Sequence, residues 1–204
     1  MGDGVTIKCF WIEPSGQARL SLRRYAASGS QCAQNGYHDA SVFIEDVPAI
    51  KTEKGYLHHF TERKPPKDDP RWPTHCTCGY VFQEADNWQL FSEWLYRRAD
   101  NGEIVTLRKL PPGAMFDAWW STPDRKGPDG RSLVAICPDG TEWCIDSRAS
   151  NCTLPDDNTH KCWIRHGEPP NITVDKNGPT CAAGAGSIVG HHGYHGFLRN
   201  GEFT

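Results

Sequence analysis

Two separate stretches of the sequence gather cysteine and histidine, the side chains that bind zinc through sulfur and nitrogen. In the first half, "THCTCGY" places Cys76 and Cys78 one residue apart, ahead of a glycine that suits a tight turn. A closed tetrahedral site needs two more ligands. The loop "CAQNGYH" offers them as Cys32 and His38, with His75 in reserve. The sequence therefore predicts a structural zinc site, against the alternative of two buried thiols and a surface histidine.

The second stretch, "NCTLPDDNTHKCWIRH", places Cys152 eight residues before His160, and His160 two residues before Cys162. Residues two apart in an extended chain share a face, so His160 and Cys162 can point toward one ion. With Cys181 they form a second candidate metal cluster. The same loop contains turn-forming residues, and cysteine is also a small hydrophobic residue, so a turn with buried thiols is the alternative. Other neighbouring ligands keep further combinations open: Cys144, His166 and His195.

The same residues also allow a catalytic interpretation. Cys152 is a candidate nucleophile, His160 or His195 its base, and Asp146 the group that orients the base. Such a triad is defined by positions in space, which the sequence does not supply. Whether the protein is an enzyme stays open, and a small Cys/His or metal-dependent hydrolase is one alternative.

Composition and charge narrow the classes of partner. The 204 residues carry a formal net charge of −3, which gives no field for nucleic acid or anionic lipid. No run of eighteen apolar residues and no secretion signal is visible, so we expect a protein that is neither secreted nor membrane-spanning. Nine cysteines in a reducing compartment more often hold metal or react than form disulfides. Zinc is the expected cofactor.

Alternating hydrophobicity predicts a β-rich N-terminal third. Residues 5–12 and 18–26 alternate with period two around the turn-rich "EPSGQ", which predicts a β-hairpin. Further strands are expected near 40–46 and 55–60. The proline-rich stretch 61–73 then predicts a linker or long surface loop.

One substantial helix is expected at about residues 87–99. Asp86 and Gln89 have the spacing of a capping box, and Trp88, Phe91 and Leu95 form an apolar stripe at helical spacing. We expect these three large side chains to pack into the core.

A second hairpin is predicted at 133–146. The pair Asp139-Gly140 lies between alternating apolar residues and favours a two-residue type I′ turn. That register places Ile136 opposite Trp143 and Val134 opposite Ile145. The opposite face would then carry four polar or sulfur-containing side chains: Cys137, Glu142, Cys144 and Asp146.

These elements together predict a mainly β fold, a β-rich α+β arrangement of loop-rich, zinc-stabilised antiparallel sheets with one substantial helix. Three regions are expected: an N-terminal β region at 1–62, the Cys-x-Cys loop and helix at 63–110, and a loop-rich β region at 111–204. We expect the three regions to form one compact domain.

The C-terminal half contains the tracts "SRASNC", "THKCWIRHGEPP", "TVDKNG" and "AGAGSI" and the ending "YHGFL". In these tracts it resembles a family of uncharacterised proteins encoded by tailed bacteriophages and prophages. The last part is also similar to a wider group of small bacterial and phage domains with a Cys-x-Cys-Gly motif. That resemblance implies Cys76 and Cys78 as ligands and favours His195 over His191 and His192. In that group a cysteine lies shortly before the terminal histidine, whereas in this chain Cys181 lies fourteen residues before His195. The identity of the fourth ligand therefore stays open.

Three function classes follow from the residues and the resemblance together. The first is a phage-encoded zinc-binding accessory protein that acts by binding a phage or host protein. The second is a virion component, such as a head or tail decoration, with the homo-oligomeric assembly this implies. The third is the small hydrolase. The expected location is the cytoplasm of an infected bacterial host, or the virion.

Overall fold

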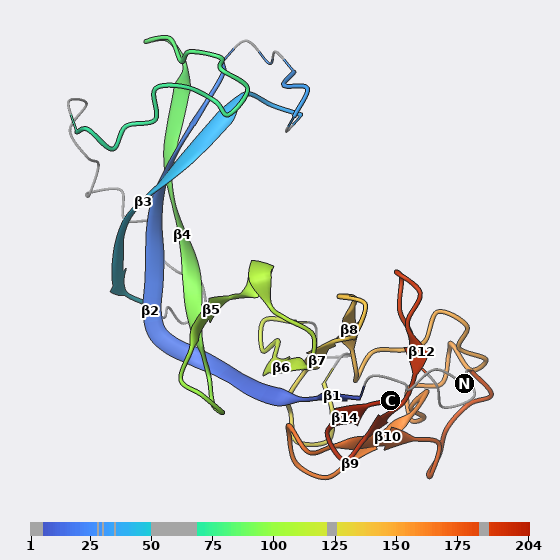
Figure 1. Ribbon diagram of the computed structural model, residues 1–204. Helices are drawn as coiled ribbons and strands as arrows, with labels where there is room; N and C mark the ends of the chain where they lie inside the picture. The colour runs from blue at the N-terminus through green and yellow to red at the C-terminus, as the bar shows by residue number, and fades with distance from the viewer. Residues whose placement is uncertain are drawn as a thin grey trace. The chain divides into compact units, whose positions relative to one another are not determined.

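The described part of the chain is built almost entirely from β-strands and loops (Figure 1). The structure is a computed structural model, and it describes residues 6–27, 29, 31–34, 36–49, 69–121, 126–183 and 188–204. Among these residues the single helix is the short 3₁₀ turn η1 (Leu107–Lys109). The predicted mainly β class is therefore confirmed. No helix in these ranges has the length and apolar character needed to cross a bilayer.

Contacts divide the chain into two units. The sheet unit comprises Pro14–Tyr96, and the core unit comprises Met1–Glu13 together with Arg97–Thr204. Both boundaries fall within long strands, β2 (Phe10–Tyr25) and β4 (Asn87–Arg98). A strand that belongs to two units leaves no linker-like composition at the boundary, and the three regions expected from the sequence stay a prediction.

The sheet unit is an antiparallel arrangement in which β2 lies between β4 and β3 (Asp39–Pro48), as Figure 1 shows. Ala18, Leu20 and Leu22 alternate along β2 and are all buried, so they define its apolar face. The register of β2 against β3 shifts between Leu20 and Ser21, which marks a β-bulge. The strand expected near 40–46 is β3. The strand expected at 55–60 and most of the proline-rich stretch lie outside the described residues.

The hairpin predicted around "EPSGQ" is wrong, because β2 continues through this stretch as one strand. Gly16 adopts φ +77, a conformation that a turn would also use. Its carbonyl instead accepts a hydrogen bond from the amide of Ala49, and the Ser15 hydroxyl donates to the carbonyl of Leu95. Neighbouring strands thus hold the turn-forming residues in an extended path.

The helix predicted at 87–99 is also wrong, because these residues form strand β4. Trp88, Leu90, Trp94 and Tyr96 also recur with period two, and aromatic residues favour strands. The residues therefore fit both a helical and a strand pattern, and hydrogen bonding to β2 stabilises the strand. Asp86 caps no helix. Its carboxylate accepts hydrogen bonds from three groups of neighbouring loops: the amides of Ala27 and Gln83 and the hydroxyl of Tyr80.

Of the three residues of the predicted stripe, Leu95 is buried, whereas Trp88 and Phe91 are half-buried. The expectation that all three would pack into a core is therefore met by Leu95 alone.

The core unit is a set of short sheets joined by loops. β6 (Ala114–Asp117), β7 (Leu133–Ile136) and β8 (Glu142–Cys144) pair in antiparallel order, and the start of β2 runs parallel to β6. β1 (Ile7–Lys8), β14 (Glu202–Phe203) and β13 (Leu198–Arg199) form a second sheet. The remaining strands are β5 (Ile104–Thr106), which pairs with β4, β9 (Ile164–His166) with β10 (Thr173–Asp175), and β11 (Ile188–Val189) with β12 (His195–Gly196).

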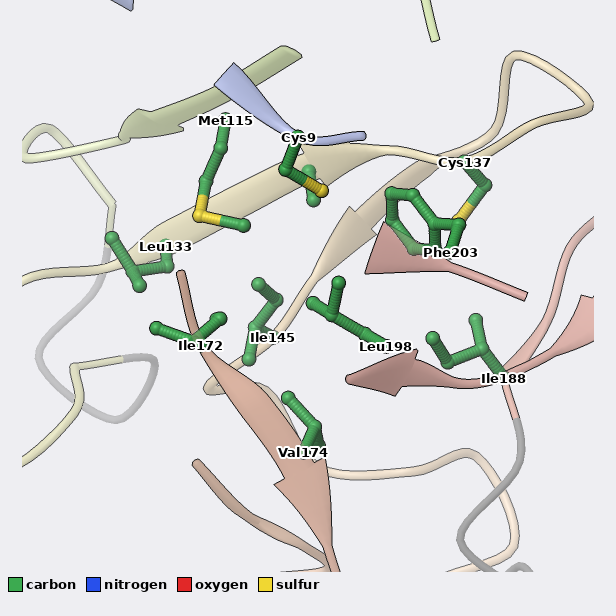
Figure 2. Packing of buried hydrophobic residues seen from close by; sticks show 11 residues of the cluster. Cys9, Met115, Leu133, Cys137, Ile145, Ile172, Val174, Ile188, Leu198 and Phe203 are labelled. Carbon is green, nitrogen blue, oxygen red and sulfur yellow. The ribbon is translucent and has the colours of Figure 1, made fainter. Parts of the chain in front are cut away.

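One hydrophobic cluster joins these sheets, as Figure 2 shows. Met115, Leu133, Ile145, Leu198 and Phe203 are all buried in it. Two cysteines also lie here, Cys9 and Cys137, and burial raises the pKa of both thiols to about 12. They act as small hydrophobic residues.

The hairpin at 133–146 forms, but its predicted register is wrong by one residue. Ala135 lies opposite Trp143 and Ile136 opposite Glu142. Pro138 is the physical reason, because it has no N–H to close a two-residue turn. The chain instead makes a longer connection in which the Gly140 amide donates to the Cys137 carbonyl and Gly140 adopts φ +82. Cys137 therefore faces the core together with Trp143 and Ile145.

Candidate metal centres

The structure contains two groups of four cysteine and histidine ligands, one in each unit. The N-terminal cluster consists of Cys32, His38, Cys76 and Cys78, and the C-terminal cluster of Cys152, His160, Cys162 and Cys181. In each cluster the ligand atoms all lie within 4.8 Å of one another. Both sets are those that the sequence grouped together. Among the described residues no other set of this kind occurs.

Distances within the N-terminal cluster fit a tetrahedral ion. The sulfurs of Cys32 and Cys76 are 3.9 Å apart. Two thiolates bound to one zinc at 2.3 Å in tetrahedral geometry lie about 3.8 Å apart. The Cys78 sulfur is 3.2 Å from Nδ1 of His38, slightly closer than the roughly 3.6 Å expected across zinc. A disulfide has an S–S bond of about 2.05 Å, so these sulfurs are not bonded to each other.

Two tight loops position these ligands. The amide of Gly79 donates to the carbonyl of Cys76, and the amide of Cys76 donates to the carbonyl of Tyr80. Gly79 adopts φ +93, which requires glycine, so the "CTCG" motif can turn both sulfurs toward one point. In the other loop Cys32 and Gly36 exchange backbone hydrogen bonds in both directions. The glycine in each motif is therefore part of how the ligands are placed.

Little hydrophobic packing surrounds the N-terminal cluster. Cys32, Cys76 and Phe82 are buried together, and Tyr80 packs against them. The His38 ring stacks on Tyr80 with centroids 4.3 Å apart and planes 11° from parallel. This contact fixes the plane of the imidazole, while Cys78 remains exposed.

Distances between ligand atoms in the C-terminal cluster are similar, but its ligands are more deeply buried. Cys181 lies 3.8 Å from Cys162 and 4.0 Å from Cys152, measured between sulfurs. Nε2 of His160 is 3.3 Å from the sulfur of Cys152. His160, Cys162 and Cys181 are buried, and Cys152 is half-buried. The thiols also contact a small apolar group that includes Ala183 and Trp163.

The turn before His160 sets which nitrogen faces the cluster. Nδ1 of His160 is 2.8 Å from the carbonyl of Asp157. Because a carbonyl only accepts, Nδ1 carries the proton and the lone pair of Nε2 points toward the sulfurs. The Asp157 carboxylate in turn accepts from the amide and hydroxyl of Thr159. A backbone carbonyl that orients a histidine ligand in this way is a common support for metal sites.

Lys176 links the segments of the C-terminal cluster. Its ammonium donates to the carbonyls of Cys162, Cys181 and Ala183 at 2.5, 2.8 and 2.8 Å. Two of these carbonyls belong to ligand residues. Zinc with three thiolates and a neutral imidazole carries +2 − 3 = −1, so one ammonium balances the charge of the filled site.

The backbone already favours one thiolate in each cluster. A hydrogen bond from the amide of Cys78 lowers the pKa of Cys76 to about 6. One from the amide of Thr153 does the same for Cys181, also to about 6. Burial raises the pKa of Cys162 to about 11. Each cluster thus combines a ready anion with a thiol of raised pKa, Cys78 in one and Cys162 in the other, that a cation must ionise.

No family model, curated protein or solved structure matches this chain. The chemistry of the two clusters is therefore what bears on function.

Several residues predicted as ligands or catalytic groups belong to neither cluster. The exposed His195 pairs with Val189 in the β11–β12 ladder, and His75 contacts the hydroxyl of Thr74. Asp146 binds Arg165 at 2.9 Å, and the group facing Nδ1 of His160 is the carbonyl of Asp157. The structure thus does not assemble the triad of Cys152, His160 and Asp146. Two other candidates are also outside the clusters: Cys144 in β8, and His166, which pairs with Asp175.

Sequence reasoning missed the groups that support the ligands, chiefly Lys176 and Tyr80. Lys176 is fourteen residues from Cys162 in sequence, and Tyr80 is forty-two from His38. Nothing in either segment marks them as partners of a ligand, since the contacts depend on how the loops fold.

Proposed function

We propose that the protein binds two structural zinc ions, one in each cluster, and acts by binding a macromolecular partner of phage or host origin. The observation that carries the proposal is that each cluster offers three sulfurs and one imidazole nitrogen within 4.8 Å. Four protein ligands of this type fill the tetrahedral shell of Zn²⁺ and leave no position for water or substrate. Iron also accepts sulfur ligands in this geometry, so the test identifies the metal.

Closed zinc sites fit a fold of short strands. The core unit contains ladders of two or three residues on each side, which give few backbone hydrogen bonds to hold the intervening loops. Metal bonds can replace those missing contacts, because binding an ion to ligands that are dispersed in the unfolded chain stabilises the folded state. A protein so stabilised can present loops rigidly to a partner.

A small hydrolase is the alternative, and one contact favours it. Cys152 and His160 lie 3.3 Å apart, which is also the geometry of a thiol and its general base. Against this, Cys162 and Cys181 lie beside the same sulfur and have no role in such a pair. A metal site uses all four residues, so we favour it.

Elemental analysis of the purified untagged protein by mass spectrometry tests the proposal. We expect about two zinc ions per chain. Fewer than one zinc ion per chain would refute structural zinc, and iron found in place of zinc would identify iron as the bound metal. Alkylation of Cys152 by iodoacetamide in the protein as isolated, with zinc absent from the C-terminal cluster, would favour the hydrolase.

The role of the protein in infection needs a separate measurement. Sedimentation of phage particles followed by immunodetection separates an accessory protein, which stays in the supernatant, from a virion component, which sediments with the particles. The phage association itself rests on the resemblance of the C-terminal half, so the protein should first be detected in infected cells.

A further inference from the structure

A cleft of about 760 Å³ lies beside the C-terminal cluster, lined by residues of three loops and of β9. His160 and Cys162 contribute to its wall, but the rest of the lining has no part in the metal site. The volume lies within the range of pockets for small organic ligands, which is roughly 300–1,000 Å³. It is several times larger than an inorganic ion requires.

The charge of this cleft is opposite to that of the whole chain. Its lining carries four permanent cations and one carboxylate, which gives +4 − 1 = +3, whereas the chain as a whole carries −3. The cations are Lys126, Arg148, Lys161 and Arg165, and the carboxylate is Asp146. Even a filled metal site of charge −1 beside it leaves the cleft cationic.

The carboxylate does not neutralise the two lysines. Asp146 binds the guanidinium of Arg165 at 2.9 Å, and Arg165 also pairs with Asp129. Lys161 donates to the backbone carbonyl of Lys126 at 3.4 Å, and no carboxylate partner of either ammonium occurs in the part of the chain that the structure describes. Both lysines are half-buried, where an unpaired charge is more costly than at the surface.

A buried hydroxyl adds a second, independent observation. Ser147 is among the residues that line the cleft, and its Oγ is buried and has no hydrogen-bond partner within the described ranges. An unpaired buried hydroxyl typically costs about 1–3 kcal/mol, so a ligand that accepts its hydrogen bond offsets a cost already present. Ammonium groups and a hydroxyl together are the donors that recognise a phosphate oxygen.

We propose that this cleft binds a small phosphorylated ligand of nucleotide size, with Lys126, Lys161 and Ser147 holding the phosphate. Two ammonium groups supply the charge and the hydroxyl supplies a directed hydrogen bond. Trp163 and Ile164 line the cleft as well and offer apolar surface for the uncharged part of the ligand. This site goes beyond the structural metal, because none of the three phosphate-binding residues is a metal ligand.

Isothermal titration calorimetry of the full-length protein at low ionic strength tests this, with pyrophosphate, AMP and uncharged adenosine as probes. We expect pyrophosphate and AMP to bind and adenosine to bind at least tenfold more weakly, because charge-assisted hydrogen bonds are lost. Affinity should fall as salt is added. No binding of either phosphate probe, or equal binding of adenosine and AMP, would overturn the proposal.

Three variants and a control locate the site. Lys126→Ala and Ser147→Ala should each weaken pyrophosphate binding several-fold, and Lys126→Ala with Lys161→Ala should weaken it by more than about tenfold. Lys109→Ala removes an exposed lysine outside the cleft and should leave the affinity unchanged. Equal affinities in the double variant and the control would overturn the assignment. Metal content, measured for each variant, separates failure of this site from failure of the zinc proposal.

Discussion

The N-terminal and C-terminal clusters share one ligand set in two different surroundings. Both follow the order Cys, His, Cys, Cys along the chain. In the N-terminal cluster Cys78 is exposed, and the local core is limited to Phe82 and a few neighbours. In the C-terminal cluster three ligands are buried and an ammonium binds the ligand backbone. The same four candidate ligands therefore stand almost alone between loops in the N-terminal cluster and among several other contacts in the C-terminal cluster.

The two histidines are also held in place by different contacts. His38 faces its cluster with Nδ1 and is fixed by ring stacking on Tyr80, whereas His160 faces its cluster with Nε2 and is fixed by a backbone carbonyl. Stacking restrains the ring plane but leaves rotation within the plane, and a hydrogen bond restrains both. We therefore expect the C-terminal cluster to hold its metal more rigidly.

Removing one ligand from each cluster should have the largest effect. Cys162→Ser and Cys76→Ser should each lower zinc from about two ions per chain to about one. Cys162→Ser should also cost more than about 4 kcal/mol of unfolding free energy, because it removes metal bonds from a cluster in which three of the four ligands are buried. Cys76→Ser should cost less, because its cluster is partly exposed. Elemental analysis and denaturant unfolding measure the two quantities.

Cys144→Ser is the matched control, since Cys144 is a half-buried thiol outside both clusters. It should keep both zinc ions. A Cys162→Ser protein that also kept two zinc ions, or a Cys76→Ser protein that was the less stable of the pair, would break the comparison.

Lys176→Met should have the next largest effect and should act on one cluster alone. Methionine keeps most of the length of the side chain but cannot donate to the three carbonyls or balance the charge of the filled site. Supports of this kind typically change metal affinity 10–100-fold, and we expect a loss in that range at the C-terminal cluster. Competition with a chromophoric chelator measures it. Lys109→Met should leave the affinity unchanged, and equal losses at both clusters would argue against a local role.

Sequence reasoning grouped the candidate ligands that the structure brings together, because the residue types and spacing typical of metal sites are visible in a sequence. Cys76 and Cys78 lie one residue apart before a glycine, and His160 and Cys162 lie two apart, so half of each cluster is local in sequence. The rule that a closed site has four ligands called for further partners, and Cys32, His38, Cys152 and Cys181 were candidates beside His75, Cys144, His166 and His195. The supporting Lys176 could not be found in this way, because lysine donates to any carbonyl that the fold brings near.

The fold was harder to predict where one stretch satisfied two patterns. Residues 87–98 carry a helical stripe at Trp88, Phe91 and Leu95 and an alternating set at Trp88, Leu90 and Trp94. Local patterns cannot decide between them, and pairing with β2 decides for the strand. At 133–146 the position of the hairpin was predicted, but Pro138 altered the turn and shifted the register by one residue.

Proton release on zinc binding should reveal whether the metal-free clusters are already folded. Cys76 and Cys181 have pKa values lowered to about 6 in the folded chain, so both are thiolates at pH 7.4 and release no proton there. A folded metal-free protein should then release about one proton fewer per cluster than unfolded ligands, whose thiol pKa values lie near 8.5. Titration calorimetry in buffers of different ionisation enthalpy counts them.

The sign of the pH dependence follows from the same values. Lowered thiol pKa values stabilise the folded metal-free clusters above the ordinary thiol pKa, and this contribution is lost as pH falls through about 6. Cys162, with a pKa raised to about 11, must lose a proton to bind, so zinc affinity of the C-terminal cluster should rise with pH above 7. A zinc affinity of the C-terminal cluster that stays constant between pH 6 and 8 would contradict the second statement.

The smallest effect should come from the ring that supports His38. Tyr80→Ala removes the stack on the imidazole at 4.3 Å and the hydrogen bond from the Tyr80 hydroxyl to Asp86, but no ligand. An aromatic pair contributes about 0.5–1.5 kcal/mol, which corresponds to a loss of zinc affinity of roughly 2- to 13-fold at the N-terminal cluster. Tyr37→Ala is the control, because Tyr37 is 63% exposed and next to the same histidine. Tyr80→Phe keeps the ring and should retain the affinity, so a loss in Tyr80→Phe equal to that in Tyr80→Ala would assign the effect to the hydroxyl rather than to stacking. A loss at the C-terminal cluster in any of these variants would mean that the two sites are not independent.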